Sequence, residues 1–206
     1  MQSDSRHAPK PTETLIHQFE SIVEQIALEK IFPKSQPLEL ELGSGDGSFL
    51  AKFAQAHPEH NFIGVERLLG RLRKIDKKGL RAGLANLRLV RIEASYLLEF
   101  LLPKKSVVAL HVYFPDPWPK RKHRRHRLIN ERFTELARTI LTENGVIYLR
   151  TDDVDYFTQM TASFATNQSF LPVATPEELA EVVTDFEKTF NARGIPTNRA
   201  AYRKLG

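Results

Sequence analysis

The stretch Leu38–Phe49, LELELGSGDGSF, decides the fold. Leucine and glutamate alternate over residues 38–42, and such alternation is typical of a β-strand. Gly43, Gly45 and Gly47 follow at the end of this strand, where glycine lets the backbone turn tightly and approach a ligand closely. Apolar residues after the loop begin a helix. The stretch therefore predicts a strand, a loop that can face a ligand, and a helix in succession.

The same alternation of strands and helices continues along the chain, which predicts a parallel sheet with right-handed crossovers. Strands are expected over residues 38–42, 61–66, 86–93, 106–114, 146–152 and 170–174, and the closing stretch IPTNRAAYRK (195–204) is expected to return as an edge strand. Helices are expected over residues 12–29, 68–84, 97–101, 128–141, 155–165 and 184–192, and from Phe49 onward. We predict a flexible tail at residues 1–11 and one doubly wound α/β domain at residues 12–206. Its mostly parallel sheet has seven strands, with helices on both faces.

Composition narrows the class of protein. The chain has 206 residues, enough for one well-packed domain and short for two, and it contains no cysteine. Without cysteine there can be no disulfide and no thiolate ligand or nucleophile. No apolar run reaches the ~20 residues that a membrane-spanning helix needs, and the first residues lack the apolar segment of a secretory signal. We expect a cytoplasmic protein.

A second stretch, HVYFPDPWPKRKHRRHR (111–127), joins a rigid corner to a basic run. Three prolines surround Asp116 and the only tryptophan, and proline restricts its own backbone and that of the residue before it. Asp116 is therefore expected to be held in place. Residues 120–127 contain six of the 30 Lys and Arg residues, so the other 24 face 25 acids and give −1. This concentration of positive charge beside a rigid acid favours contact with a phosphate backbone over a merely solvated helix start.

Acids mark the ends of the first five predicted strands, at Glu41, Glu66, Glu93, Asp116 and Asp152. Ligands of open parallel sheets bind beyond the carboxyl ends of the strands. A glycine loop alone is as compatible with an ordinary turn as with a ligand site. However, Ser48 replaces the third glycine of the dinucleotide fingerprint, and the acids beside the loop would repel a pyrophosphate. They suit a cationic ligand with hydroxyl groups, such as S-adenosylmethionine, whose ribose Glu66 could bind and whose adenine amino group Glu93 could bind.

The motifs ELGSGDGSF, FIGVE, FPDPWPKRKHRRHR, LRTD and TDFEKTFNARGIP extend over Leu38–Arg199. On these motifs the chain resembles the bacterial tRNA (guanine-N7)-methyltransferase family, which has a class I, Rossmann-like fold. FPDPWPK with its basic tail is the most specific of them. The resemblance implies transfer of a methyl group from S-adenosylmethionine to N7 of a guanine in tRNA, the guanine of the variable loop.

The resemblance also implies roles for individual residues. Contacts to the methyl donor fall on Glu41, Gly43, Gly45, Glu66, Glu93 and Asp116, and Asp116 occupies the position labelled catalytic. Substrate positions are Lys120, Asp152, Thr184, Asp185, Phe186 and Glu187, and RNA-contacting positions are Lys122, His123, Arg124, Arg125, His126 and Arg127. Glu93 stands where the family usually has aspartate, and His126 interrupts a cluster that is commonly all basic. No metal is expected, because no carboxylate or cysteine accompanies the two histidines.

The chemistry assigns Asp116 a positioning role. Guanine N7 has a lone pair and no proton to lose, so its methylation needs alignment more than a base. We expect Asp116, Asp152 and Glu187 to orient guanine through its N1–H and exocyclic amine. Three other functions are considered: a nicotinamide-dependent oxidoreductase, a noncatalytic RNA-binding module, and an exocyclic-amine methyltransferase whose N/D-P-P-aromatic loop occupies the same strand end. The oligomeric state, monomer or homodimer, is left open.

Overall fold

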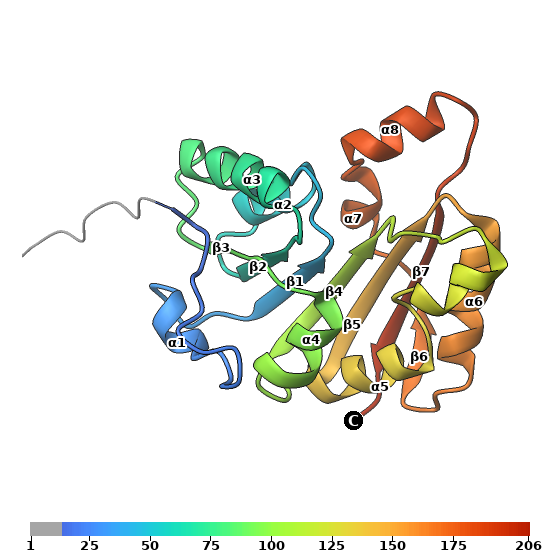
Figure 1. Cartoon of the computed structure of the whole chain (residues 1–206), viewed down its shortest axis with the longest axis horizontal. Coiled ribbons are helices and arrows are strands. Elements are labelled where there is room, and N and C mark those ends of the chain that lie inside the picture. The colour runs from blue at the N-terminus through green and yellow to red at the C-terminus, as the bar shows by residue number, and fades with distance from the viewer. Residues whose placement is uncertain (1–13) are drawn as a thin grey trace, which may run out of the picture.

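A seven-stranded sheet in the order β3-β2-β1-β4-β5-β7-β6 forms the centre of the molecule (Figure 1). The computed structural model describes residues 14–206, so the tail predicted for residues 1–11 lies outside the described residues. The strands are β1 Leu38–Leu42, β2 Asn61–Val65, β3 Leu87–Val90, β4 Val107–Tyr113, β5 Leu141–Thr151, β6 Phe170–Val173 and β7 Asn198–Lys204. The pairs among β1 to β5 are parallel, and β7 is antiparallel to β5 and to β6. The predicted fold class is confirmed.

The sequence predicted that the last strand, β7, would lie at an edge of the sheet, and this prediction is wrong. Strand β7 pairs with β5 on one side and with β6 on the other, so β6 forms that edge. The sequence pattern could not show this, because an antiparallel strand inserted between two others has the same alternation as an edge strand.

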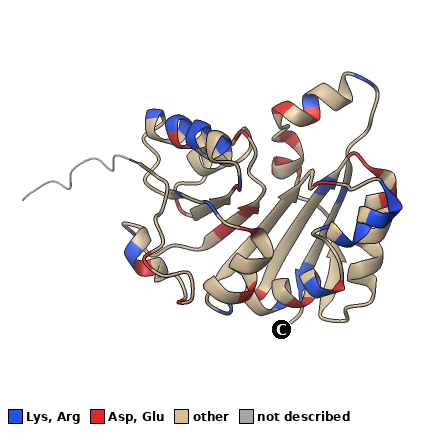
Figure 2. Cartoon of the chain, in the orientation of Figure 1, with Lys and Arg blue, Asp and Glu red and all other residues tan. Residues whose placement is uncertain are grey.

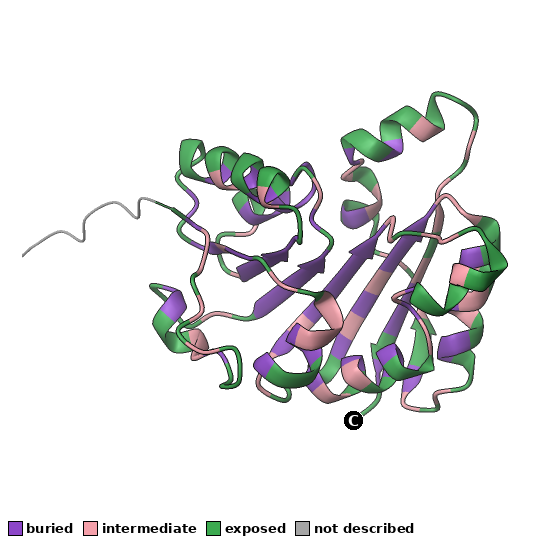
Figure 3. Cartoon of the chain, viewed as in Figure 1, coloured by how far each residue is buried: buried purple, intermediate pink, exposed green. Residues whose placement is uncertain are grey.

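Helices cover both faces of the sheet. They are α1 Leu28–Ile31, α2 Leu50–Ala56, α3 Leu69–Arg81, α4 Ala94–Tyr96, a π-helical turn η1 Leu97–Leu101, a 3-10 helix η2 Arg121–His126, α5 Glu131–Ile140, α6 Val154–Ala165, α7 Glu177–Glu181 and α8 Asp185–Asn191. One core lies between the sheet and α1, η1, α5 and α6, and the other between the sheet and α2, α3 and α7. Strands β1 to β4 are buried along nearly all of their length, β6 and β7 are partly exposed, and the outer helix surfaces are exposed (Figure 3). Within residues 14–206, no helix is both long and apolar enough to cross a membrane.

The helix predicted over residues 12–29 is wrong in the described part, where only Leu28–Ile31 is helical. The preceding segment runs along the outer side of β3, where Ile16 forms a parallel bridge with Leu89. His17 N donates to Leu89 O at 2.8 Å, and Leu89 N donates to Leu15 O at 2.9 Å. An edge strand presents unpaired backbone groups, and pairing with them outweighs the helical spacing of the apolar residues.

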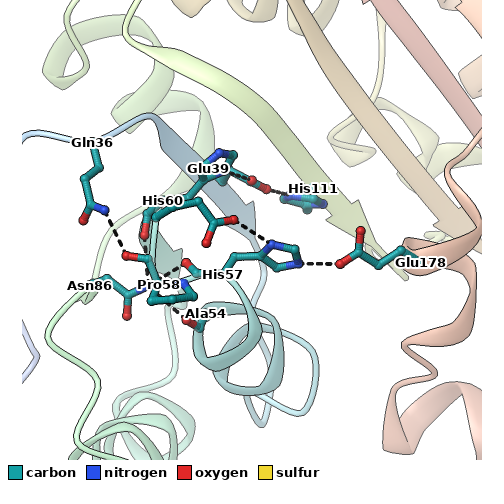
Figure 4. A network of polar contacts seen from close by, with 10 residues as sticks. Gln36, Glu39, Ala54, His57, Pro58, His60, Asn86, His111 and Glu178 are labelled. Atoms are coloured by element: carbon teal, nitrogen blue, oxygen red, sulfur yellow. Dashed lines mark hydrogen bonds and ion pairs between the residues drawn. The ribbon is translucent and has the colours of Figure 1, made fainter.

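Strand β1 buries both of its faces, although its sequence alternates between leucine and glutamate. Its leucines lie in one core, whereas Glu39 and Glu41 lie on the other face and are 6 % and 4 % exposed. Glu39 Oε2 lies 2.7 Å from His111 Nε2 of β4, and its other oxygen contacts His60 (Figure 4). His111 Nδ1 lies 2.8 Å from the Tyr113 hydroxyl. Burial would raise the pKa of Glu39, but the hydrogen bonds of His111 and His60 outweigh it and hold the pKa below its usual value.

Candidate active site

A cavity of 740 Å³ lies beyond the carboxyl ends of β1, β2, β3 and β4, in the size range of small-molecule sites. Its lining includes Gly43, Glu66, Glu93, Asp116, Trp118 and Phe186. Helix α8 lies over the ends of β4 and β5 at this side of the sheet (Figure 1). The structure thus brings together the glycine loop, the acids at three strand ends and the segment Pro115–Pro119, which we call the proline corner. These parts are far apart in the sequence.

The glycine loop turns sharply and is fixed against β2. Gly43, Gly45 and Gly47 have φ values of 79°, 55° and 71°, a region that only glycine adopts without strain. Gly43 N and Ser44 N both donate to Val65 O at 2.9 Å. A Cβ atom on Gly47 would lie 2.8 Å from the Ile75 side chain, so α3 packs directly on the loop. The loop therefore has one defined shape, with Gly43 facing the cavity.

Glu66 holds the loop at the end of β2. Its Oε2 accepts from Gly45 N at 3.1 Å and its Oε1 accepts from Leu68 N at 2.8 Å. The residue is 6 % exposed and lines the cavity. Two backbone donors fix this carboxylate in place, and its remaining lone pairs can still accept from a ligand. Its predicted role at the ribose stays a prediction.

Glu41, at the end of β1, is a buried acid with an unused acceptor. Its Oε2 has no hydrogen-bond partner among residues 14–206, and the side chain is buried beneath the loop. Burial raises the pKa of Glu41 to about 8, while Arg150 acts in the opposite direction. A cationic ligand beside the loop would supply the missing partner. The chemistry of Glu41 therefore fits a sulfonium or ammonium donor and does not fit a pyrophosphate.

Glu93 lines the cavity but also starts a helix. Its carboxylate accepts from Ser95 N at 3.0 Å and from Tyr96 N at 2.8 Å, and so caps α4. Each oxygen keeps a further lone pair for a ligand. The contact to adenine stays a prediction.

The proline corner displays Asp116 at the mouth of the cavity. Asp116 is exposed, and its Oδ1 accepts from Trp118 N at 3.1 Å. Phe114 and Trp118, on either side, have φ values of 52° and 43°, and non-glycine residues in this region carry roughly 1–3 kcal/mol of strain each. Such strain persists only where neighbouring contacts enforce it. The corner is thus built to hold one conformation.

The basic run 121–126 forms η2, whose histidines turn toward the corner. The ring centroids of His123 and His126 lie 5.8 and 5.2 Å from that of Trp118. The side chains of Lys122, Arg124 and Arg125 are exposed. The RNA contacts predicted for these five residues stay predictions.

Arg127 does not share the exposed surface of this run. It is 2 % exposed, and its guanidinium bonds to Pro117 O, Gln159 and Asp155. The direct RNA contact predicted for Arg127 is therefore incompatible with its position in this structure. The sequence could not show this, because a buried and a solvated arginine look alike in a basic run.

The predicted substrate residues are dispersed around the cavity. Of the six, Phe186 lines it, half-exposed, with its ring centroid 5.0 Å from that of Phe114. Thr184 caps α8 by accepting from Glu187 N at 3.0 Å, and Asp185 N donates to Ser48 Oγ at 3.3 Å, which docks α8 on the glycine loop. Lys120 is exposed before η2, and Asp152 is half-buried after β5.

Glu187 is fully buried and paired with two arginines. Its carboxylate bonds to Arg150 at 3.1 Å and also to Arg199. In this position Glu187 anchors α8, and the guanine contact predicted for it stays a prediction.

Arg150 of β5 is a residue that the sequence reasoning missed. It is 1 % exposed, bonds to the carbonyls of Leu179 and Val182, and lies 4.3 Å from the centroid of the Tyr113 ring. The signal in the sequence is an arginine within the apolar strand VIYLRTD. Among residues 14–206, no group of three or more His, Asp or Glu side chains is placed to hold a metal ion.

Comparisons with known proteins agree with this geometry. Residues 35–200 match the model of a family described as "Putative methyltransferase". The tRNA (guanine-N(7)-)-methyltransferase of Listeria monocytogenes serotype 4b (strain F2365) is 32% identical over 175 residues, 82% of this chain and 81% of the relative. The relative of the same name from Chromohalobacter salexigens is 36% identical over 151 residues, 73% of this chain and 61% of the relative.

Solved structures show the same fold. The 16S rRNA methyltransferase KamB has a TM-score of 0.63 at 15% identity, covering 86% of this chain and 92% of KamB. TrmN from Thermus thermophilus has a TM-score of 0.60 at 17% identity, covering 83% of this chain and 45% of TrmN. The extent of the sequence matches, on top of the strand-end acids and the proline corner, shows that this chain belongs to the tRNA (guanine-N7)-methyltransferase family.

Proposed function

We propose that this protein transfers the methyl group of S-adenosylmethionine to N7 of a guanine in tRNA. The observation that carries the proposal is the buried Glu41 carboxyl group, which lies two residues before Gly43 of the cavity lining and whose Oε2 has no hydrogen-bond partner among residues 14–206. Asp116 and exposed cations lie at the other side of the same cavity. A cationic donor and an anionic acceptor can therefore meet at one site.

The donor half of the site consists of the residues at the ends of β1, β2 and β3. Glu41 would face the positively charged part of the donor, Glu66 its ribose hydroxyls and Glu93 its adenine. Gly43 leaves room for close approach, since no atom lies within 4 Å of where its Cβ would be. Bound there, S-adenosylmethionine supplies an electrophilic methyl group.

The acceptor half positions a base. Asp116 Oδ2 makes no hydrogen bond within residues 14–206, so it is free to accept from the N1–H and exocyclic amine of guanine. The Phe114 and Phe186 rings offer an aromatic surface on which a base can stack. N7 needs no deprotonation, so alignment of its lone pair with the methyl group supplies most of the rate, ~7–11 kcal/mol at best.

RNA affinity arises from the cations around the cavity. Figure 2 shows Lys and Arg residues on η2 at one side of the molecule and on α3 at the other. Arg125 and Arg71 reach the lining from these two sides. Each phosphate contact made by such residues adds about 0.7–0.9 to the salt slope of binding.

The test is the identity of the modified nucleoside. We expect the purified protein, incubated with unmodified tRNA and S-adenosylmethionine, to form 7-methylguanosine, measured by mass spectrometry of the digested RNA. Borohydride and aniline treatment cleaves RNA at 7-methylguanosine, and cleavage in the variable loop would support that guanine as the target. N2-methylguanosine in place of 7-methylguanosine would favour an exocyclic-amine enzyme, and no methylated nucleoside at all would refute the proposal.

A further inference from the structure

Arg127 is a cation built into the interior of the proline corner. Its Nε donates to Pro117 O at 2.7 Å, and its two terminal nitrogens donate to Gln159 at 2.9 Å and to Asp155 at 2.6 Å. The guanidinium carbon lies 4.8 Å from the centroid of the Tyr156 ring. All three nitrogens of the planar fork are therefore engaged within the protein.

Around Asp116 the corner has few other hydrogen bonds to the body of the protein, although Phe114 N donates to Arg150 O at 2.8 Å just before it and the Trp118 ring packs on His123 and His126. Pro115, Pro117 and Pro119 have no N–H to donate, and the hydrogen bond from Trp118 N to Asp116 is internal to the corner. Within residues 14–206, the Pro117 carbonyl is bonded to Arg127. This one contact joins the residue next to Asp116 to the body of the protein.

The other end of the fork is attached to a rigid support. Gln159 and Asp155 belong to α6, and Gln159 Nε2 also donates to Ile129 O at 3.0 Å. The Tyr156 hydroxyl accepts from Ile129 N at 2.8 Å. The hydrogen bond from Arg127 lowers the pKa of Asp155, so this acid stays ionised and paired. Arg127 thus connects the corner to the packed helix α6.

A lysine at position 127 could not make the hydrogen bonds that the Arg127 guanidinium makes. A guanidinium presents donors in a fixed planar arrangement, whereas an ammonium is a compact point charge on a flexible stem. A buried lysine at position 127 would keep the positive charge but could not reach Pro117, Gln159 and Asp155 together. Charge and geometry can therefore be separated by experiment.

We propose that Arg127 is a positioning residue: it acts through the Pro117 carbonyl to hold Asp116 in the geometry for methyl transfer and does not contact RNA. The proposal rests on the proposed function for its kinetic consequence. Its structural consequence can be measured without any substrate.

The kinetic test compares Arg127→Lys and Arg127→Gln with Arg124→Gln. Arg124 is a matched control, because it pairs with the same Asp155 oxygen at 3.1 Å but is exposed on η2. We expect both Arg127 variants to lose roughly 10–100-fold in kcat at saturating tRNA, the effect of a misplaced reacting group. Their tRNA affinity and salt slope should equal those of the wild type. Arg124→Gln should instead raise the KM for tRNA and lower the salt slope by about one.

A second measurement uses Trp118, the only tryptophan in the chain. We expect Arg127→Lys to shift its fluorescence emission to longer wavelength and to increase its quenching by acrylamide, because the released corner exposes the ring. Gln159→Leu, which keeps every cation, should shift the emission in the same direction. If Arg127→Gln fails to fold, these two variants still decide the question.

The outcomes separate the two proposals. Full turnover in Arg127→Lys, an unchanged Trp118 signal in both variants, or a salt slope reduced by about one in Arg127→Gln would each overturn the positioning role. A wild-type protein that does not methylate tRNA would refute the proposed function, yet the fluorescence test of Arg127 would still stand.

Discussion

At the scale of single residues, the acids of the site differ in how they are held. Glu41 is buried with a free acceptor, Glu66 is bound by two backbone donors, and Asp116 is exposed on a strained corner. Their sequence positions look equivalent, since each closes a strand. Only the environment separates a buried acid with a raised pKa from an exposed one that can orient a base.

Glu41 gives a prediction about pH and stability. Its pKa is about 8 in the folded protein and 4.5 without burial, so between these values the folded state holds more protons than the unfolded state. The contribution of Glu41 to the free energy of unfolding is fully present below pH 4.5 and is lost as the pH rises to 8, on the order of 5 kcal/mol in total. We expect Glu41→Gln to remove this loss, so that the variant gains stability relative to the wild type as pH rises.

Urea unfolding of the ligand-free protein at pH 5, 7 and 9 checks this. The control is Glu143→Gln, at an exposed position. Its free energy of unfolding should differ from that of the wild type by the same amount at all three pH values. A constant difference for Glu41→Gln would contradict the prediction.

At the scale of elements, helix α8 is held to the sheet by a buried ion pair. It has seven residues and starts at a capping box, and its buried Glu187 pairs with Arg150 of β5 and Arg199 of β7. This anchor sets the position of Phe186, which lines the cavity. The helix therefore depends on one carboxylate that reaches into the sheet.

Removal of that charge should loosen α8. We expect Glu187→Gln to lower stability by up to ~3–5 kcal/mol, since it leaves two arginines without their anion, and to speed amide hydrogen exchange over residues 185–191. Asp185→Asn, on the exposed side of the same helix, should leave both quantities unchanged. Unaltered exchange in Glu187→Gln would mean that α8 is held by other contacts.

The sequence predicted elements well where pattern and environment agree. The central strand β4 and the α/β alternation follow from apolar runs, and the corner at Asp116 follows from proline chemistry. Prediction failed where tertiary pairing decides. Residues 14–27 show helical spacing, but Leu15, Ile16 and His17 pair with β3. Arg127 belongs to a basic run but is buried under the corner. Such partners are distant in sequence, so no local pattern records them.

At the scale of the whole molecule, the charge is distributed over two surfaces. Helix α3, Leu69–Arg81, has six Lys and Arg residues and one acid, a net +5, and the carboxylate of that acid, Asp76, accepts from Leu15 N and Thr14. Residues 120–127 contribute +6. The whole chain has a net charge of +5, so the residues outside these two segments carry a net −6. Two cationic surfaces on an otherwise acidic protein flank the cavity.

We therefore expect both surfaces to contribute to tRNA binding. The double variant Lys74→Glu, Lys77→Glu on α3 should bind tRNA more weakly and with a smaller salt slope, because phosphate contacts release counterions. Lys104→Glu/Lys105→Glu, in the loop before β4 and so at the amino end of the sheet, makes the same change in net charge and should have a smaller effect. Filter binding at several salt concentrations measures both. Equal effects would show that net charge alone, and not the surface of α3, governs affinity.

The insertion of β7 between β5 and β6 has a consequence for the order in which the chain folds. Within the described residues β6 pairs with β7, so a nascent chain that has just emerged through Val173 has no sheet neighbour for β6. Strand β6 must wait until residues 198–204 leave the ribosome before this half of the sheet can close. A stop anywhere before Asn198 would release a polypeptide with two strands missing from the sheet, β6 as well as β7, and with the edge of β5 open to aggregation.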